Sequence, residues 1–279
     1  TIGVIIPPSI PFVIYGVVAN ASITKMFTAG ILPGVLMGVA LMIVCYIVSK
    51  KNGYVGSDER KSAKEIWTAF KEAFWAILSP VIILGGIYSG IFTPTEAAVV
   101  SVVYSLIVGV FIYKELDYKE TYAAFRDAID VNGATTFMVG LSAAFAVLLT
   151  LEKIPLKIAM FITGLSDNGI IILLLINAFL LLVGMFIDNI PATIILSPIL
   201  LPVAVKLGMD PITFGVMLTM NLAIGFCTPP YGINLFVASA ISKVDMGLLS
   251  RKILWPIIGL LAVLALVTYV DPVTMMFIK

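Results

Sequence analysis

The chain has 279 residues, of which 61% are hydrophobic and 12% charged, and its formal net charge is +1. Apolar runs recur along the whole length, which is the composition of a membrane protein. This composition excludes a soluble hydrolase and a nucleic-acid binder. The sequence has no histidine, and its two cysteines show no spacing typical of zinc ligands or of a disulfide framework.

Residues 1–24 carry no charge and contain a pair of consecutive prolines, Pro7 and Pro8. Consecutive prolines cannot continue a helix, so we expect a broken helical tip here, followed by the arm that leaves it. The arm that enters this tip would lie upstream. Because the chain starts inside the motif, without a methionine, we expect it to be the C-terminal part of a longer protein.

Residues 26–49 form an uncharged run that is long enough to span a membrane. Gly30, Gly34 and Gly38 are evenly spaced along it, so that they fall on one face of a helix. Such spacing lets another helix pack closely in lipid; the alternative is a lipid-facing span with scattered glycines.

The middle of the chain alternates between charged and apolar segments. Residues 50–72 are rich in lysine and arginine, with apolar side chains at helical spacing, and predict a cytoplasmic helix lying along the membrane surface. An uncharged span at 73–95 follows. Residues 114–130 predict a second surface helix, and 131–151 another span.

A helix start is predicted at Thr93, with Pro94 in the first helical position and Glu96 in the third. Glu96 therefore has two interpretations. It either completes a capping box with Thr93, or it carries a proton or cation through the membrane.

Two apolar runs, 168–187 and 189–205, are split by Asp188 close to a proline, Pro191. As one helix, 170–205 would be about 54 Å long, too long for an untilted crossing. An acid inside apolar sequence indicates a functional site, whereas a helix end that reaches the interface is the alternative.

The long stretch between Asp210 and Lys243 contains no charged residue. As a straight helix it would be about 48 Å long, against a hydrocarbon core of about 30 Å. Pro229 and Pro230 interrupt it near the middle. We therefore expect a re-entrant helical hairpin whose tip opens at membrane depth; a proline kink in an ordinary membrane helix is the alternative. A last span is expected at 253–270.

The two tips are copies of one another. The glycine and the paired prolines at 225–230 recur at 3–8 in the same relative positions. Lysines and arginines place the open end of the second hairpin in the cytoplasm and that of the first on the opposite face. Two hairpins that enter from opposite faces are typical of an inverted repeat. Free carbonyls at such tips suit a small cation, and helix N-termini suit an anion.

Four segments together resemble one family: IPPSIP at 6–11, GIFTPTEAA at 90–98, GMFID at 184–188 and GFCTPPYGINLF at 225–236. The joint pattern is similar to the large membrane subunit of tripartite ATP-independent periplasmic (TRAP) transporters. The resemblance runs from residue 1 to about residue 271. It implies a multi-pass protein of the bacterial inner membrane that imports an organic acid, such as a C4-dicarboxylate or sialic acid, with sodium.

The resemblance also implies partners and an architecture. A periplasmic substrate-binding protein would deliver the substrate, and a small four-helix membrane subunit, separate or fused, would join the large one. The implied fold is an all-α polytopic membrane protein with an inverted repeat, two re-entrant hairpins and elevator-type motion. We assign residues 1–49 and 166–279 to the transport domain and residues 50–165 mainly to the scaffold.

The coupling ion is expected at the tips. The resemblance implies sodium ligands at Gly184, Gly225, Thr228 and Tyr231, largely through backbone oxygens. Tyr231 departs from the smaller or unbranched residues of the family, but a backbone role survives that change. From the internal repeat, we add Gly3, Ile6 and Ser9 as part of a first sodium site. Asp188 is expected either to help hold a cation or to cap the broken helix.

The organic acid is expected between the tips, near Pro8, Ser9, Thr228, Pro230 and Asn234. The amide of Asn234 suits a carboxylate or a hydroxyl group. We expect no catalytic residue and no organic cofactor.

Two other functions are the alternatives. A stand-alone sodium- or proton-coupled organic-anion carrier keeps the same fold but needs no binding protein. An intramembrane enzyme is disfavoured because the sequence has no histidine, no pair of aspartates at a plausible catalytic depth and no convincing serine–base pair.

Overall fold

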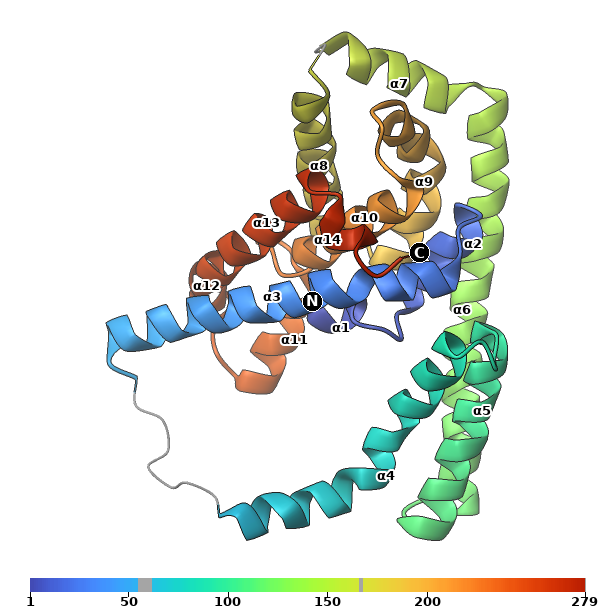
Figure 1. Ribbon diagram of the computed structural model, residues 1–279, viewed down its shortest axis with the longest axis vertical. Helices are drawn as coiled ribbons and strands as arrows, with labels where there is room; N and C mark the ends of the chain where they lie inside the picture. Colours follow the sequence, from blue (N-terminus) through green and yellow to red (C-terminus); the bar gives the residue numbers. More distant parts are fainter. Residues whose placement is uncertain (55–61, 166–167, 279) are drawn as a thin grey trace. The chain divides into compact units, whose positions relative to one another are not determined.

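The computed structural model describes residues 1–54, 62–165 and 168–278, without the side chains of Ile233 and of scattered positions between 131 and 165. All regular secondary structure in the described ranges is helical, as the sequence predicts (Figure 1). Part of the predicted basic segment, at 55–61, and part of the predicted turn at 164–169 lie outside the description, as do many side chains of the predicted span at 131–151.

The chain divides into two compact units, one of Thr1–Lys51 with Met138–Lys279 and one of Asn52–Phe137. The first carries both predicted tips. The helices of the N-terminal half are α1 (Ile2–Ile5), α2 (Ile10–Val18), α3 (Ile23–Asn52), α4 (Ala63–Tyr88), α5 (Pro94–Ile107), η1 (Val108–Ile112) and α6 (Tyr118–Leu151). Those of the C-terminal half are α7 (Ile154–Leu165), α8 (Gly169–Phe186), α9 (Asn189–Lys206), α10 (Pro211–Gly225), α11 (Ile233–Ser242), α12 (Met246–Lys252), α13 (Leu254–Tyr269) and α14 (Pro272–Met275).

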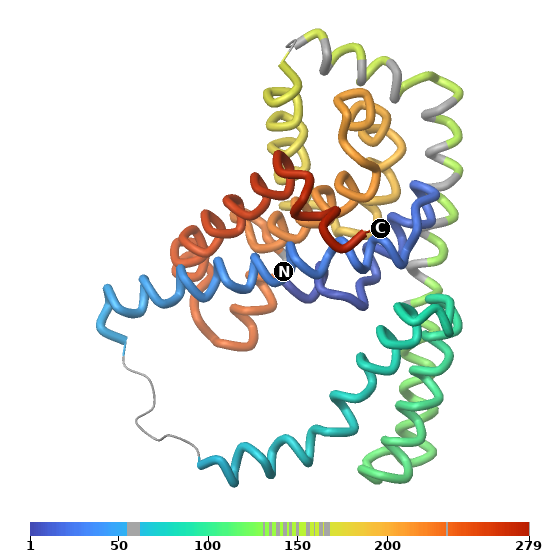
Figure 2. Tube along the Cα trace, viewed as in Figure 1, coloured from blue at the N-terminus to red at the C-terminus, as the bar shows by residue number. Residues whose placement is uncertain are grey.

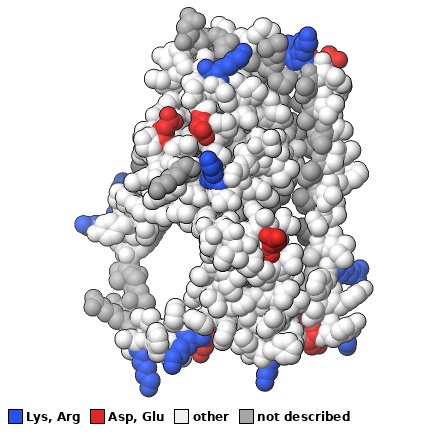
Figure 3. Space-filling view, turned by 45° about the vertical axis from the view of Figure 1, so that its right-hand side comes forward, with Lys and Arg blue, Asp and Glu red and all other residues white. Residues whose placement is uncertain are grey.

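Five described helices are long and apolar enough to cross a membrane: α3, α4, α8, α9 and the continuous helix of α5 and η1. α12 and α13, bent by 43° at their junction, make a sixth span if they are counted as one. Most of the surface in Figure 3 belongs to residues other than Lys, Arg, Asp and Glu. These features confirm the predicted class, an all-α multi-pass membrane protein.

The predicted separation of surface helices from spans is wrong in two places. The predicted surface helix within 50–72 and the span after it form one helix, α4. It starts at a capping box in which the Ser62 hydroxyl accepts from the Glu65 N–H and the Glu65 carboxylate accepts from the Ser62 N–H. The helix continues from its charged part into its apolar part, with Pro80 inside it. In the same way, α6 joins the predicted segments 114–130 and 131–151.

The helix start predicted at Thr93 is confirmed. The Thr93 hydroxyl accepts from the Glu96 N–H at 3.3 Å, and the Glu96 carboxylate accepts from the Thr93 N–H at 2.8 Å. Pro94 occupies the first helical position. The structure thus confirms the capping box predicted for Glu96.

α10 is the central helix of the first unit. Every residue of α10 from Ile212 to Gly225 is buried, and the helix contacts α1, α2, α8, α9, α13 and α14. Tyr15 of α2 is fully buried and donates to the Pro211 carbonyl at 2.6 Å, so the arm leaving the first tip holds the start of α10. Figure 2 traces the course of these helices, and Gly259 of α13 lies against Val44 of α3, since an added Cβ would lie 3.0 Å from Cγ2 of that valine.

Glycines of α3 make room for the first tip. A Cβ atom on Gly30 would lie 2.6 Å from the Ile5 carbonyl oxygen, and one on Gly34 would lie 2.5 Å from Cγ1 of Ile6. Gly38 is different, because a Cβ there would meet only Ile2 Cδ1, at 3.9 Å. Close packing is therefore confirmed for Gly30 and Gly34, and the partner is the first tip.

We expect a Gly30→Leu substitution to destabilise the complete protein by about 1–3 kcal/mol, because the new side chain collides with the backbone of the first tip. Gly38→Leu, on the same helix, is the matched control and should change stability little. Thermal unfolding of the purified protein in detergent measures both effects. Equal melting temperatures for the two variants would contradict the packing described here.

Candidate functional site

The second tip opens where the sequence predicts. α10 ends at Gly225 and α11 begins at Ile233. Between them the chain folds back on the last turn of α10, since the Thr228 N–H donates to the Gly225 carbonyl at 2.9 Å and the Thr228 hydroxyl donates to the Ile224 carbonyl at 2.8 Å. These bonds give the broken backbone the partners that lipid cannot supply.

Several carbonyl groups converge at this tip. Gly232, which precedes α11, has a positive φ of 42°, a conformation that favours glycine. A Cβ there would lie 3.0 Å from the Thr228 carbonyl oxygen and 3.2 Å from that of Phe226. The Phe226 carbonyl accepts the Asn234 N–H at 3.0 Å. Oxygen atoms of this kind suit a small hard cation.

The break between α8 and α9 lies against the second tip. A Cβ on Gly225 would lie 2.5 Å from the backbone carbon of Gly184 and 2.9 Å from its carbonyl oxygen. A Cβ on Gly184 would in turn lie 2.9 Å from Cα of Leu222. The two glycines therefore bring the backbones of α8 and α10 into direct contact, and this contact joins two of the residues predicted to bind sodium.

Asp188 stands at the N-cap of α9, where its carboxylate accepts from the Asn189 N–H at 2.6 Å. The side chain is exposed. Of the two roles left open by the sequence, the geometry supplies the cap. A negative charge at this position also interacts favourably with the helix dipole of α9.

At the first tip, α1 ends at Ile5 and α2 begins at Ile10. Ser9, only 2% exposed, is the N-cap of α2; its hydroxyl donates to the Val4 carbonyl at 2.5 Å and accepts from the Phe12 N–H at 3.3 Å. A contact between this hydroxyl and a substrate would thus require its release from these bonds.

The other predicted residues of the first tip differ in their surroundings. A Cβ on Gly3 would meet no atom within 4 Å. Ile6 is 40% exposed and packs against Gly34, and Pro8 is exposed. The second-tip residues Pro230 and Tyr231 are also exposed, and the Tyr231 ring packs on a neighbouring ring, that of Phe236, at 5.2 Å between centroids.

Cys227 of the second tip contacts the residue that precedes α1. Its sulfur lies 3.0 Å from the Thr1 hydroxyl of the first tip and accepts from the Asn234 amide at 3.4 Å. Residues that are 226 positions apart in the sequence are thereby in contact. Cys227 was not among the predicted site residues, although its position in the middle of the tip was a usable signal.

Buried polar side chains in the neighbouring helices were also missed. They form two groups, one connecting α8, α10 and α13 and one along α9 facing α10: Asn177, Asn221 and Thr268, and Asn189, Thr193 and Ser197. The available signal was an amide inside an apolar run, because polar groups in membrane helices face protein or water rather than lipid.

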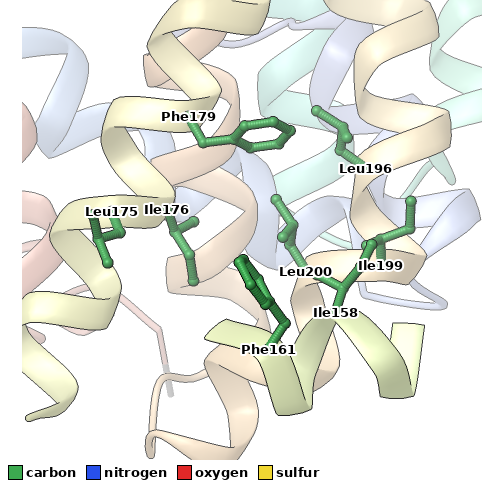
Figure 4. A pocket seen from close by; sticks show the side chains of 8 residues that line it. All are labelled: Ile158, Phe161, Leu175, Ile176, Phe179, Leu196, Ile199 and Leu200. Atoms are coloured by element: carbon green, nitrogen blue, oxygen red, sulfur yellow. The ribbon is translucent and has the colours of Figure 1, made fainter. Parts of the chain in front are cut away.

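An apolar cavity of about 360 Å³ lies between α7, α8 and α9 (Figure 4). Its lining is entirely apolar: Ile158, Phe161, Leu175, Ile176, Phe179, Leu196, Ile199 and Leu200. None of the predicted site residues lines it. An anionic substrate would find no polar partner there, so we place the candidate site at the tips instead.

Within the described residues, no group of three or more His, Cys, Asp or Glu side chains could hold a metal ion.

Comparisons with known proteins give consistent matches. Residues 1–273 match the family model described as tripartite ATP-independent periplasmic transporter, DctM component. The chain is 46% identical over 276 residues to the isethionate TRAP transporter permease protein DctMQ of Oleidesulfovibrio alaskensis, covering 99% of this chain and 44% of that protein.

Two further relatives are similar at about the same level. The sialic acid TRAP transporter large permease protein SiaM of Vibrio cholerae is 41% identical, and the C4-dicarboxylate TRAP transporter large permease protein DctM of Pseudomonas aeruginosa is 40% identical. Each match covers 99% of this chain and 64% of the relative. The chain therefore spans less than two thirds of the length of these three relatives.

We expect Gly225→Ala to destabilise the complete protein by about 1–3 kcal/mol and to displace the second tip, because one methyl group collides with the backbone of Gly184. Gly85→Ala, a helical glycine whose added Cβ would meet no atom within 4 Å, is the control and should be neutral or slightly stabilising. Thermal unfolding and the rate of thiol labelling at Cys227 measure the two effects. Unchanged values for Gly225→Ala would show that the two backbones are not in contact.

Asp188 variants separate its two roles. If the carboxylate caps α9, Asp188→Ala should lose about 1 kcal/mol of stability while Asp188→Asn, an equally good cap, keeps it. Both variants should then bind sodium as the parent does. Weakened sodium binding in Asp188→Asn at unchanged stability would instead show that the negative charge of Asp188 helps to bind the cation.

Proposed function

The chain belongs to the DctM component family of tripartite ATP-independent periplasmic transporters, and from this premise we propose that it forms the sodium- and substrate-binding part of a secondary active importer of organic acids. Its relatives are permeases rather than enzymes. The single observation that carries the proposal is the direct backbone contact between Gly184 and Gly225, which joins the break between α8 and α9 to the second tip inside one compact unit.

Sodium binds at the tips through oxygen atoms. At the second tip the proposed ligands are Gly184, Gly225, Thr228 and Tyr231, with Asp188 close in sequence to the first of them. The direct contact between Gly184 and Gly225 supports this set, as do the carbonyls that surround Gly232. At the first tip the proposed ligands are Gly3, Ile6 and Ser9.

The organic acid binds between the tips, beside Pro8, Ser9, Thr228, Pro230 and Asn234. The N-terminus of α11 lies at the second tip, and the positive end of a helix dipole attracts an anion. The Asn234 amide, which donates to the sulfur of Cys227, can also donate to the acid group. The relatives are named for isethionate, sialic acid and C4-dicarboxylates, which share an acid group.

The proposed architecture is an inverted repeat that moves as an elevator. Both tips have the same order of elements, a helix end, a proline pair, a short arm and then a long apolar segment. The long apolar segments that follow the two arms include α3 and α13, which contact one another at Val44 and Gly259. Residues 1–49 and 166–279 form the moving transport domain, and residues 50–165 mainly the scaffold.

The complete transporter needs further parts. We propose a periplasmic protein that delivers the substrate and a small four-helix membrane subunit, separate or fused, in the bacterial inner membrane. The names of the relatives support a multi-part system, because they contain the term TRAP together with permease or large permease.

We expect Thr228→Ala and Asn234→Ala each to reduce sodium-driven uptake at least tenfold while leaving folding largely intact, because each removes a polar group proposed to bind ion or substrate. Uptake of labelled organic acids is measured in proteoliposomes with the complete membrane protein, an inward sodium gradient and the periplasmic protein. Cys45→Ser, on the exposed side of α3, is the control that should transport normally.

The same assay tests the wider proposal. Undiminished uptake by both variants at equal expression would contradict the site. Uptake without the periplasmic protein would instead favour a stand-alone carrier, and uptake that is indifferent to sodium would remove the coupling role of the tips.

A further inference from the structure

Three buried polar side chains connect α8, α10 and α13. The Asn221 amide donates to the Asn177 side-chain oxygen at 2.6 Å and to the Met217 carbonyl at 2.9 Å, and the Asn177 amide donates to the Thr268 hydroxyl at 3.1 Å. Asn221 is 0% exposed, Thr268 3% and Asn177 6%. In apolar surroundings these groups have no water to bond, so the helices keep the register in which the bonds form.

The same register controls the second tip. Asn221 lies about one helical turn before Gly225 on α10, and Asn177 lies about two turns before Gly184 on α8. The Asn177–Asn221 bond and the Gly184–Gly225 contact therefore lie along one shared seam between the two helices. A shift of either helix along this seam would move the backbone oxygens that Gly184 and Gly225 present.

Stability alone does not explain Asn221. Its side-chain oxygen is buried without a hydrogen-bond partner among the described residues. Such an oxygen is costly, whereas leucines at both 177 and 221 would leave neither side-chain amide unpaired. Buried polar groups that cost stability are known to fix the register of packed helices.

We propose that Asn221, through its bond to Asn177 and from there to Thr268, is a positioning residue that sets the backbone of the second tip for sodium. This inference rests on the proposed function, because it assigns the cation to that tip. Asn221 does not touch the ion; it acts through the register of α10 against α8.

The experiment measures the accessibility of Cys227, which lies in the second tip. In the complete membrane protein, Cys45 and any cysteine outside this segment are replaced by serine, and the rate of maleimide labelling at Cys227 is measured as sodium chloride replaces choline chloride. Sodium should slow labelling of the parent protein. In Asn221→Leu and in Asn177→Leu, the half-saturating sodium concentration should rise about tenfold. A change of this size corresponds to the free energy of one buried hydrogen bond.

Two comparisons distinguish positioning from general destabilisation. The Asn177→Leu/Asn221→Leu double variant should shift the sodium dependence no further than either single variant, because both break the same bond. Thr213→Val breaks a buried bond of 2.6 Å between Thr213 of α10 and Thr274 of α14, at the opposite end of α10. It should lower the melting temperature without changing the sodium dependence.

Three results would overturn the inference. One is parental sodium dependence in Asn221→Leu, and another is an equal shift in Thr213→Val. The third is the absence of sodium protection in the parent protein, which would remove the sodium assignment at this tip as well. Proteoliposome uptake then separates the two failures, because sodium-driven uptake that persists without protection at Cys227 would place the ion elsewhere.

Discussion

Broken helices inside a hydrocarbon layer must find partners for their free backbone groups within the protein. The second tip meets this constraint by folding back on α10, with Thr228 bonded to the carbonyls of Gly225 and Ile224. The first tip meets it with Ser9, which caps α2 and bonds the Val4 carbonyl. Each tip thus finds partners for its backbone within the protein, and we propose that the ion and the acid bind beside these tips.

Glycines and buried amides have different roles in the packing around the tips. Gly184 and Gly225 let two backbones touch, and Gly30 lets α3 pack against the first tip. Close contact between smooth helix surfaces does not by itself fix how far one helix slides along the other. The bond between Asn177 and Asn221 supplies that fixed point.

The sequence predicts local breaks well, because proline pairs and capping residues act on the residues beside them. The ends of α10 and α11, the break at Asp188 and the capping box at Thr93 all follow from such signals. Charge patterns predicted the helix boundaries less well, since α4 and α6 each continue as one helix from a charged part into an apolar part. The contact between Thr1 and Cys227 was not predictable, because a pairing across 226 positions depends on how whole helices pack.

A cryo-EM map of the complete transporter, prepared in sodium with a transported acid, tests the central claim most directly. Density for the acid group should lie between the two tips, beside Thr228 and Asn234, with the Gly184–Gly225 contact intact. Density for the acid in the apolar cavity between α7, α8 and α9, or at any place bounded by only one tip, would contradict the proposed site.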